Sequence, residues 1–64
     1  MCDLKAYVLK EGREELVLEA VNQLRVDGRE VVVRNLFGEE RRVNGEINEV
    51  SLVKCRVVLI PRAD

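Results

Sequence analysis

The residue with the most chemistry to offer is the cysteine at position two. Initiator methionine is generally removed before a small residue such as Cys2, and its removal leaves an amine and a thiol on the same residue. These two groups close a five-membered chelate ring on a metal, and the backbone nitrogen of Asp3, once deprotonated by the metal, closes a second ring. Nitrogen and thiolate donors in one plane suit Ni(II) or Cu(II). The Asp3 carboxylate is a candidate weak oxygen ligand.

One chain supplies few such donors, so two copies of Cys2 at a dimer interface would make a better site. The alternative is that Cys2 is a terminal residue with no role. Cys55 is expected to be a small core residue, because free cysteine is among the most buried residue types. Its alternative role is that of a second metal thiolate, which requires the fold to bring it beside Cys2.

Composition excludes most enzymatic chemistry. The chain contains no histidine, so the usual general base near neutral pH is absent, and no CxxC or HExxH metal motif occurs. An enzyme is therefore the least expected class. Eleven basic residues stand against twelve acidic residues, for a net charge of −1, which is a poor balance for coating a nucleic-acid backbone. RNA remains an alternative but disfavoured partner, since Glu39-Glu40 directly precedes Arg41-Arg42.

The 64 residues predict one domain, 1–64, built from strands. Twelve valines and two isoleucines against three alanines favour strands, because a branched Cβ packs well on a pleated surface. Segment 14–25 also fits a helix, but Leu18 would lie off the apolar stripe, so strands with a bend at residues 19–21 are preferred. The expected strands are Leu4–Lys10, Glu15–Glu19, Leu24–Val26, Glu30–Asn35, a polar edge strand Glu40–Val43 and Cys55–Ile60.

Turn residues punctuate these strands. Residues 10–13, Lys-Glu-Gly-Arg, indicate a hairpin turn in which Gly12 takes the positive φ. Asp27-Gly28 and Asn44-Gly45 are strong signals for two-residue hairpin turns with positive φ. Leu36-Phe37-Gly38-Glu39 is a further turn, in which Leu36 and Phe37 are expected to anchor the core; an exposed Phe37 would indicate a partner surface instead. About six to seven short strands at this spacing are typical of a small all-β barrel or sandwich.

The expected location is the cytoplasm. No apolar run approaches the length of a membrane span, and the first residues lack the apolar stretch of a secretory signal, so no membrane association is expected. The two cysteines are accordingly interpreted as reduced thiols. A disulfide between Cys2 and Cys55, which would join the two ends of the chain, is the alternative.

The chain resembles the CooT-like proteins, which are small cytoplasmic proteins associated with nickel handling for carbon monoxide dehydrogenase. The matching features are the opening Met1–Val8, the segment Glu15–Glu19, the Leu36–Glu40 turn with Val43-Asn44-Gly45 and Ile47 after it, and the ending Val57–Ile60. The Met-Cys start and the Leu-Phe-Gly-Glu-Glu turn are the most specific of these. Together they extend over essentially the whole chain.

The resemblance implies a small SH3-like barrel, a homodimer, and one Ni(II) bound through Cys2. It implies a non-enzymatic metallochaperone-type accessory protein with a client metalloenzyme. Proteins of this kind are also labelled as predicted RNA-binding proteins. That label rests on the barrel fold, and a fold alone is weak evidence for RNA binding. A protein-docking module without a ligand is the remaining alternative, and an apolar patch around Phe37 or Tyr7 would favour it.

Overall fold

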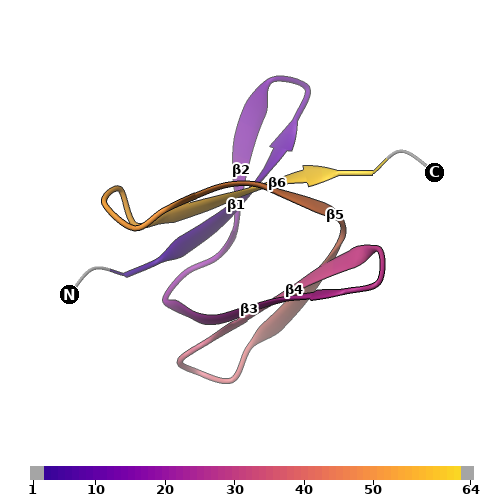
Figure 1. Ribbon diagram of the computed structural model, residues 1–64. Helices are drawn as coiled ribbons and strands as arrows, with labels where there is room; N and C mark the ends of the chain where they lie inside the picture. The colour runs from indigo at the N-terminus through magenta and orange to yellow at the C-terminus, as the bar shows by residue number, and fades with distance from the viewer. Residues whose placement is uncertain (1–2, 63–64) are drawn as a thin grey trace.

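The computed structural model describes residues 3–62 and contains six β-strands (Figure 1). The predicted all-β class and the lower of the two expected strand numbers are confirmed. Segment 14–25 is extended rather than helical, with residues 19–20 forming the bend between two strands. The strands are β1 (Lys5–Lys10), β2 (Arg13–Leu18), β3 (Val21–Asp27), β4 (Glu30–Asn35), β5 (Glu40–Ser51) and β6 (Arg56–Pro61).

The strands form one mixed sheet in the order β2-β1-β6-β5-β4-β3. The pair β1–β6 is parallel and the other pairs are antiparallel. The predicted barrel is wrong for this structure, because the described residues show no ladder between the outer strands β2 and β3 that would close the sheet. Backbone groups at the β2–β3 crossover bond elsewhere: the N–H of Val21 donates to Leu4 (2.8 Å), and the carbonyl of Ala20 accepts from Leu36 (3.1 Å).

Strand β5 joins the two halves of the folded sheet (Figure 1). Its first part pairs with β4, and its second part, from Gly45 onward, pairs with β6. The expected polar edge strand is therefore the start of a long interior strand. The expected turn at Asn44-Gly45 is also wrong, because both residues lie within β5. Gly45 is required by close approach instead: a Cβ there would overlap the Ile60 carbonyl oxygen and lie 2.9 Å from the Pro61 Cα.

Two hairpin turns follow local turn chemistry. Glu11 and Gly12 have φ of 51° and 78°, and they connect the paired residues Lys10 and Arg13, which is the type I′ pattern. The β3–β4 hairpin is confirmed, but its turn is centred one residue later than predicted. Gly28 has φ 63°, and the residues that close the turn are Asp27 and Glu30.

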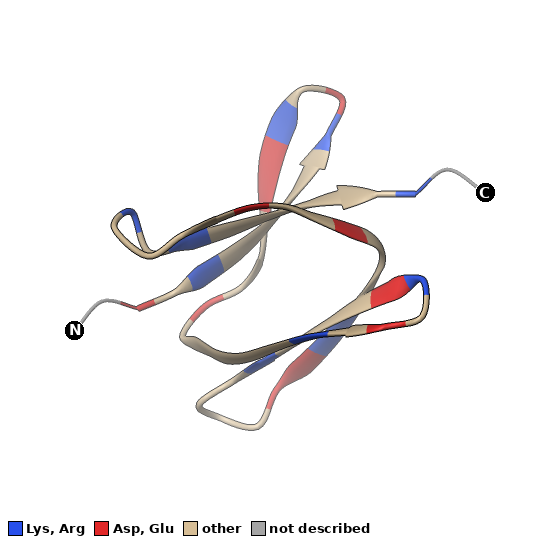
Figure 2. Cartoon of the chain, viewed as in Figure 1, with Lys and Arg blue, Asp and Glu red and all other residues tan. Residues whose placement is uncertain are grey.

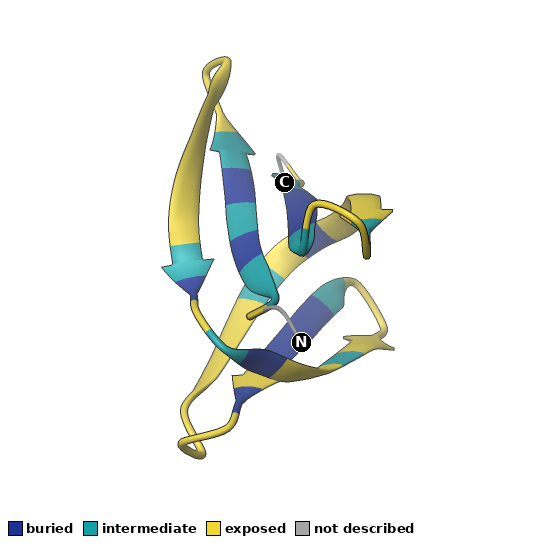
Figure 3. Cartoon of the chain, turned by 90° about the vertical axis from the view of Figure 1, so that its left-hand side faces the viewer, coloured by how far each residue is buried: buried dark blue, intermediate teal, exposed yellow. Residues whose placement is uncertain are grey.

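The core lies between the two halves of the sheet, where β1 and β6 face β4 (Figure 3). Alternation along β1 holds as predicted, with Ala6 and Val8 buried. Small and branched side chains suit this thin core, because they fill the space between the layers in few rotamers. The central cluster of buried residues consists of Ala6, Leu18, Val21, Val31, Val33, Val57 and Leu59.

The predicted turn after β4 is organised by the buried side chain of Asn35. Its Oδ1 accepts from the backbone N–H groups of Phe37 (3.0 Å) and Glu39 (2.9 Å), and its Nδ2 donates to the Glu39 carboxylate (2.7 Å). This network holds the loop without apolar anchoring. The expectation that Leu36 and Phe37 anchor the core is wrong, since their exposed fractions are 66% and 78%.

Candidate functional site

The N-terminal segment meets two other parts of the chain at one end of the sheet. The carbonyl of Leu4 accepts from the N–H of Val21, and the N–H of Lys5 donates to the carbonyl of Cys55 at 3.0 Å. These two bonds fix the position of the backbone at Leu4 and Lys5, directly after the predicted ligands Cys2 and Asp3 in the chain. Asp3 is exposed there. Cys2 lies outside the described residues.

Cys55 occupies the turn between β5 and β6 rather than the last strand. It is half-buried and has φ 57°, a backbone conformation that is uncommon for residues other than glycine. Its Sγ lies 3.6 Å from the Leu52 carbonyl oxygen and 4.0 Å from that of Val53. The predictions of a core position and a reduced thiol are both wrong: Cys55 is disulfide-bonded. Strand alternation failed here because the turn, and not the strand, sets this residue's direction.

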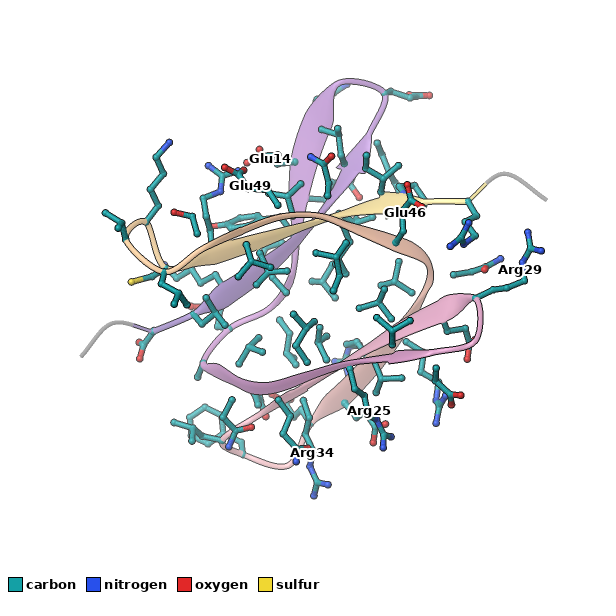
Figure 4. All side chains as sticks on the ribbon, viewed as in Figure 1. Glu14, Arg25, Arg29, Arg34, Glu46 and Glu49 are labelled. Atoms are coloured by element: carbon teal, nitrogen blue, oxygen red, sulfur yellow. The ribbon has the colours of Figure 1, made fainter. Side chains whose placement is uncertain are left out.

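The outer face of β1 and β6 carries a polar contact that the sequence did not reveal. The Arg56 guanidinium forms an ion pair with Glu14 and lies 5.4 Å from the centre of the Tyr7 ring. The hydrogen bond with Glu14 is the main cause that raises the pKa of Arg56, and Glu49 adds a smaller charge effect; Glu14 and Glu49 lie near each other in Figure 4. The cluster fastens β2 to β6 across β1. Nothing in the spacing of these residues could have predicted it, because their contact depends on strand order.

An open groove of about 500 Å³ lies beside Asp3. Apolar residues such as Leu16 and Phe37 line it together with the acidic residues Glu19 and Glu39. The described residues that line it include no nucleophile paired with a general base. Among residues 3–62, no group of three or more histidine, cysteine, aspartate or glutamate residues is placed to hold a metal ion.

Comparison with known families supplies the decisive observation. The profile of the family described as CO dehydrogenase accessory protein CooT matches residues 1–60. The chain belongs to the CooT family. The suspected resemblance is thereby confirmed, and the match includes the N-terminal segment with Cys2 and Asp3. The family description is that of an accessory protein to CO dehydrogenase.

Structural comparison agrees with the CooT assignment. A crystal structure of a protein described as a candidate CooT from Carboxydothermus hydrogenoformans superposes with a TM-score of 0.86 at 27% identity. The superposition covers 97% of this chain and 100% of that chain. No functionally curated protein matches the chain. In the part of the chain that the structure describes, no helix is long and apolar enough to cross a membrane.

Proposed function

We propose that this CooT-family chain is a nickel-binding accessory protein of the cytoplasm and that two copies hold one Ni(II) through Cys2. The observation that carries the proposal is a family match that begins at residue 1 and includes a cysteine at position two. The Cys2 amine and thiolate are the principal donors. The Asp3 backbone nitrogen and carboxylate are secondary donors. When bound, the metal is cargo for a client metalloenzyme, CO dehydrogenase.

The described residues next to Cys2 support this donor set in the reduced protein. Asp3 is exposed, and the backbone is fixed from Leu4 and Lys5 onward by hydrogen bonds to Val21 and Cys55. The donors thus extend from a rigid edge of the sheet. Because residues 3–62 provide no metal cluster of their own, a second copy is the natural source of the remaining ligands.

An apolar surface at the same end of the sheet fits that second copy. Leu52 and Val53, in the β5–β6 turn, have exposed fractions of 77% and 95%, and Val50 on β5 is 48% exposed. Cys55 belongs to this turn and accepts the hydrogen bond from Lys5, so the surface adjoins the start of β1. Burying these side chains against a symmetry-related copy would bring two N-terminal segments together.

We expect the double variant Leu52→Glu and Val53→Asp to shift the protein from dimer to monomer. Charges at the centre of an apolar interface weaken association by about tenfold or more. Sedimentation velocity across a concentration series measures the effect. The matched control is Val26→Asp, an exposed valine on β3 (63%), which should leave the dimer intact. A double variant as dimeric as its parent would exclude this surface.

Native mass spectrometry of protein from nickel-supplemented cells tests the proposal as a whole. The expected species is a dimer of chains that begin at Cys2 and carry one nickel. The same chain with Met1 retained is the control and should bind nickel more weakly, because its α-amine is no longer on Cys2. A reduced dimer without Met1 that stays metal-free in excess nickel contradicts the proposal.

The charged face of β3, β4 and β5 does not favour the RNA alternative. Arg42 lies 3.2 Å from Glu30, 3.7 Å from Asp27 and 3.9 Å from Glu40, and Arg25 lies 3.7 Å from Glu40. Acidic and basic residues are interspersed over these strands (Figure 2). Phosphate groups would meet carboxylates at this face, so we expect no salt-dependent binding of RNA.

A second candidate function is docking on a client protein without a metal. The exposed Phe37, held out by the Asn35 network, favours it, since an aromatic side chain 78% exposed on a braced loop is suited to a partner pocket. Co-purification with CO dehydrogenase from cells, with and without Phe37→Ser, separates the two functions. Docking that persists in metal-free protein and is lost in Phe37→Ser supports this candidate.

A further inference from the structure

Cys55 lies beside the start of β1, close to the segment that carries the proposed metal donor Cys2. β1 and β6 are parallel, Lys5 pairs with Arg56, and the Lys5 N–H donates to the Cys55 carbonyl at 3.0 Å. Cys55 therefore lies directly beside the place where the N-terminal segment leaves the sheet, as the start of β1 and the β5–β6 turn show in Figure 1. Cys2 stands three residues before Lys5. Three residues span at most about 10 Å, which is ample for a disulfide to the neighbouring turn.

The bonding and the backbone conformation of Cys55 are both unusual for a core cysteine. It is disulfide-bonded in the structure, and Cys2 is the other cysteine of the chain. Its Sγ lies 3.6 Å and 4.0 Å from the Leu52 and Val53 carbonyl oxygens, in a half-buried turn whose left-handed backbone favours glycine or asparagine. Cysteine is not required by the shape of this turn, so its thiol is available for another role.

We propose that Cys55 is the redox partner of Cys2 and that a reversible disulfide between them switches nickel binding off. In the oxidised state both thiols lose their protons, one S–S bond forms within the chain, and two electrons pass to a low-molecular-weight disulfide, which is cleaved to two thiols. The Cys2 sulfur is then no longer a thiolate, so it is lost as a metal donor. Reduction by a thiol reverses the exchange and restores the donor. This inference rests on the proposed function of Cys2.

The experiment compares the parent and Cys55→Ser, both beginning at Cys2, before and after treatment with oxidised glutathione. Intact mass and peptide mapping report the disulfide, and a nickel titration reports the metal site. We expect the treated parent to lose two hydrogen masses, to show an intrachain link and to bind nickel at least about tenfold more weakly, with recovery after reduction. Cys55→Ser should keep its nickel affinity after treatment. The affinity is read from the unmodified chain, which its intact mass distinguishes from any glutathione adduct.

Two outcomes overturn the switch. One is a treated parent that forms only intermolecular disulfides or glutathione adducts. The other is an intrachain disulfide that leaves nickel affinity unchanged. A reduced parent that binds no nickel at all refutes the proposed function and the switch together, whereas an absent intrachain link in a nickel-binding parent refutes the switch alone. Cys55→Gly, which suits φ 57°, replaces Cys55→Ser if the serine variant fails to fold.

Discussion

Replacing Gly45 with alanine is expected to prevent stable folding. The added Cβ would overlap the Ile60 carbonyl oxygen and stand 2.9 Å from both the Ile60 carbonyl carbon and the Pro61 Cα. These are backbone atoms of β6 at its pairing with β5, so they cannot move aside as a flexible side chain would. Relief requires separating the two strands at the point where β5 passes from one half of the sheet to the other.

The expected cost is about 3 kcal/mol or more, which approaches the whole stability that a single core of this size supplies. Urea unfolding followed by circular dichroism measures it. Glu46→Ala, at the next and exposed position of β5, should change the free energy of unfolding by about 0.5 kcal/mol or less. Gly12→Ala has open space but φ 78°, so a loss of about 1 kcal/mol is expected. A Gly45→Ala protein as stable as Gly12→Ala would show that the strands separate more easily than argued.

Replacing Cys2 with serine is expected to lower the affinity for Ni(II) by about a hundredfold or more. A serine hydroxyl stays protonated near neutral pH and is a poor ligand for a borderline-soft metal, so the chelate keeps its amine and loses its thiolate. Isothermal titration under reducing conditions, with the chain beginning at position two, measures the change. The fold should be unaffected, because the backbone hydrogen bonds of Leu4 and Lys5 tie the start of β1 to Val21 and Cys55 without using the side chain of residue two.

Two variants serve as controls for this result. Cys55→Ser under the same reducing conditions should bind nickel as tightly as the parent does. This control shows that the loss of affinity is specific to the Cys2 thiolate and does not follow from removing any thiol. Asp3→Asn should lose only a fewfold in affinity, because its carboxylate is a secondary donor. If Cys2→Ser binds nickel as tightly as its parent, the metal is held elsewhere and the docking function becomes the leading proposal.

Much of the secondary structure follows from local sequence chemistry. Val31, Val32 and Val33 favour an extended backbone wherever they are placed, and β4 contains all three. The Glu11-Gly12 turn was predictable because positive φ is a property of the residues in the turn. The candidate donors at Cys2 and Asp3 were proposed in the same way, since an amine, a thiol and an amide on neighbouring residues are placed to chelate a metal whatever the fold.

Other features depended on contacts between distant residues. Asn44-Gly45 has the composition of a hairpin turn, yet it lies in a strand because β6 passes too close for any side chain at Gly45. The contact of Arg56 with Glu14 and Tyr7 required the order β2-β1-β6, which no short-range pattern encodes.

The sequence by itself determined that this protein is a small all-β domain and singled out Cys2 as its candidate metal ligand, because strand preference, turn chemistry and ligand type are properties of neighbouring residues. Only the tertiary structure decided that the sheet stays open, that β1 lies parallel to β6, and that Cys55 is beside the start of β1. The physical reason is that strand order and register are chosen by core burial and by hydrogen bonding across the sheet. Those terms join residues that are far apart in the chain.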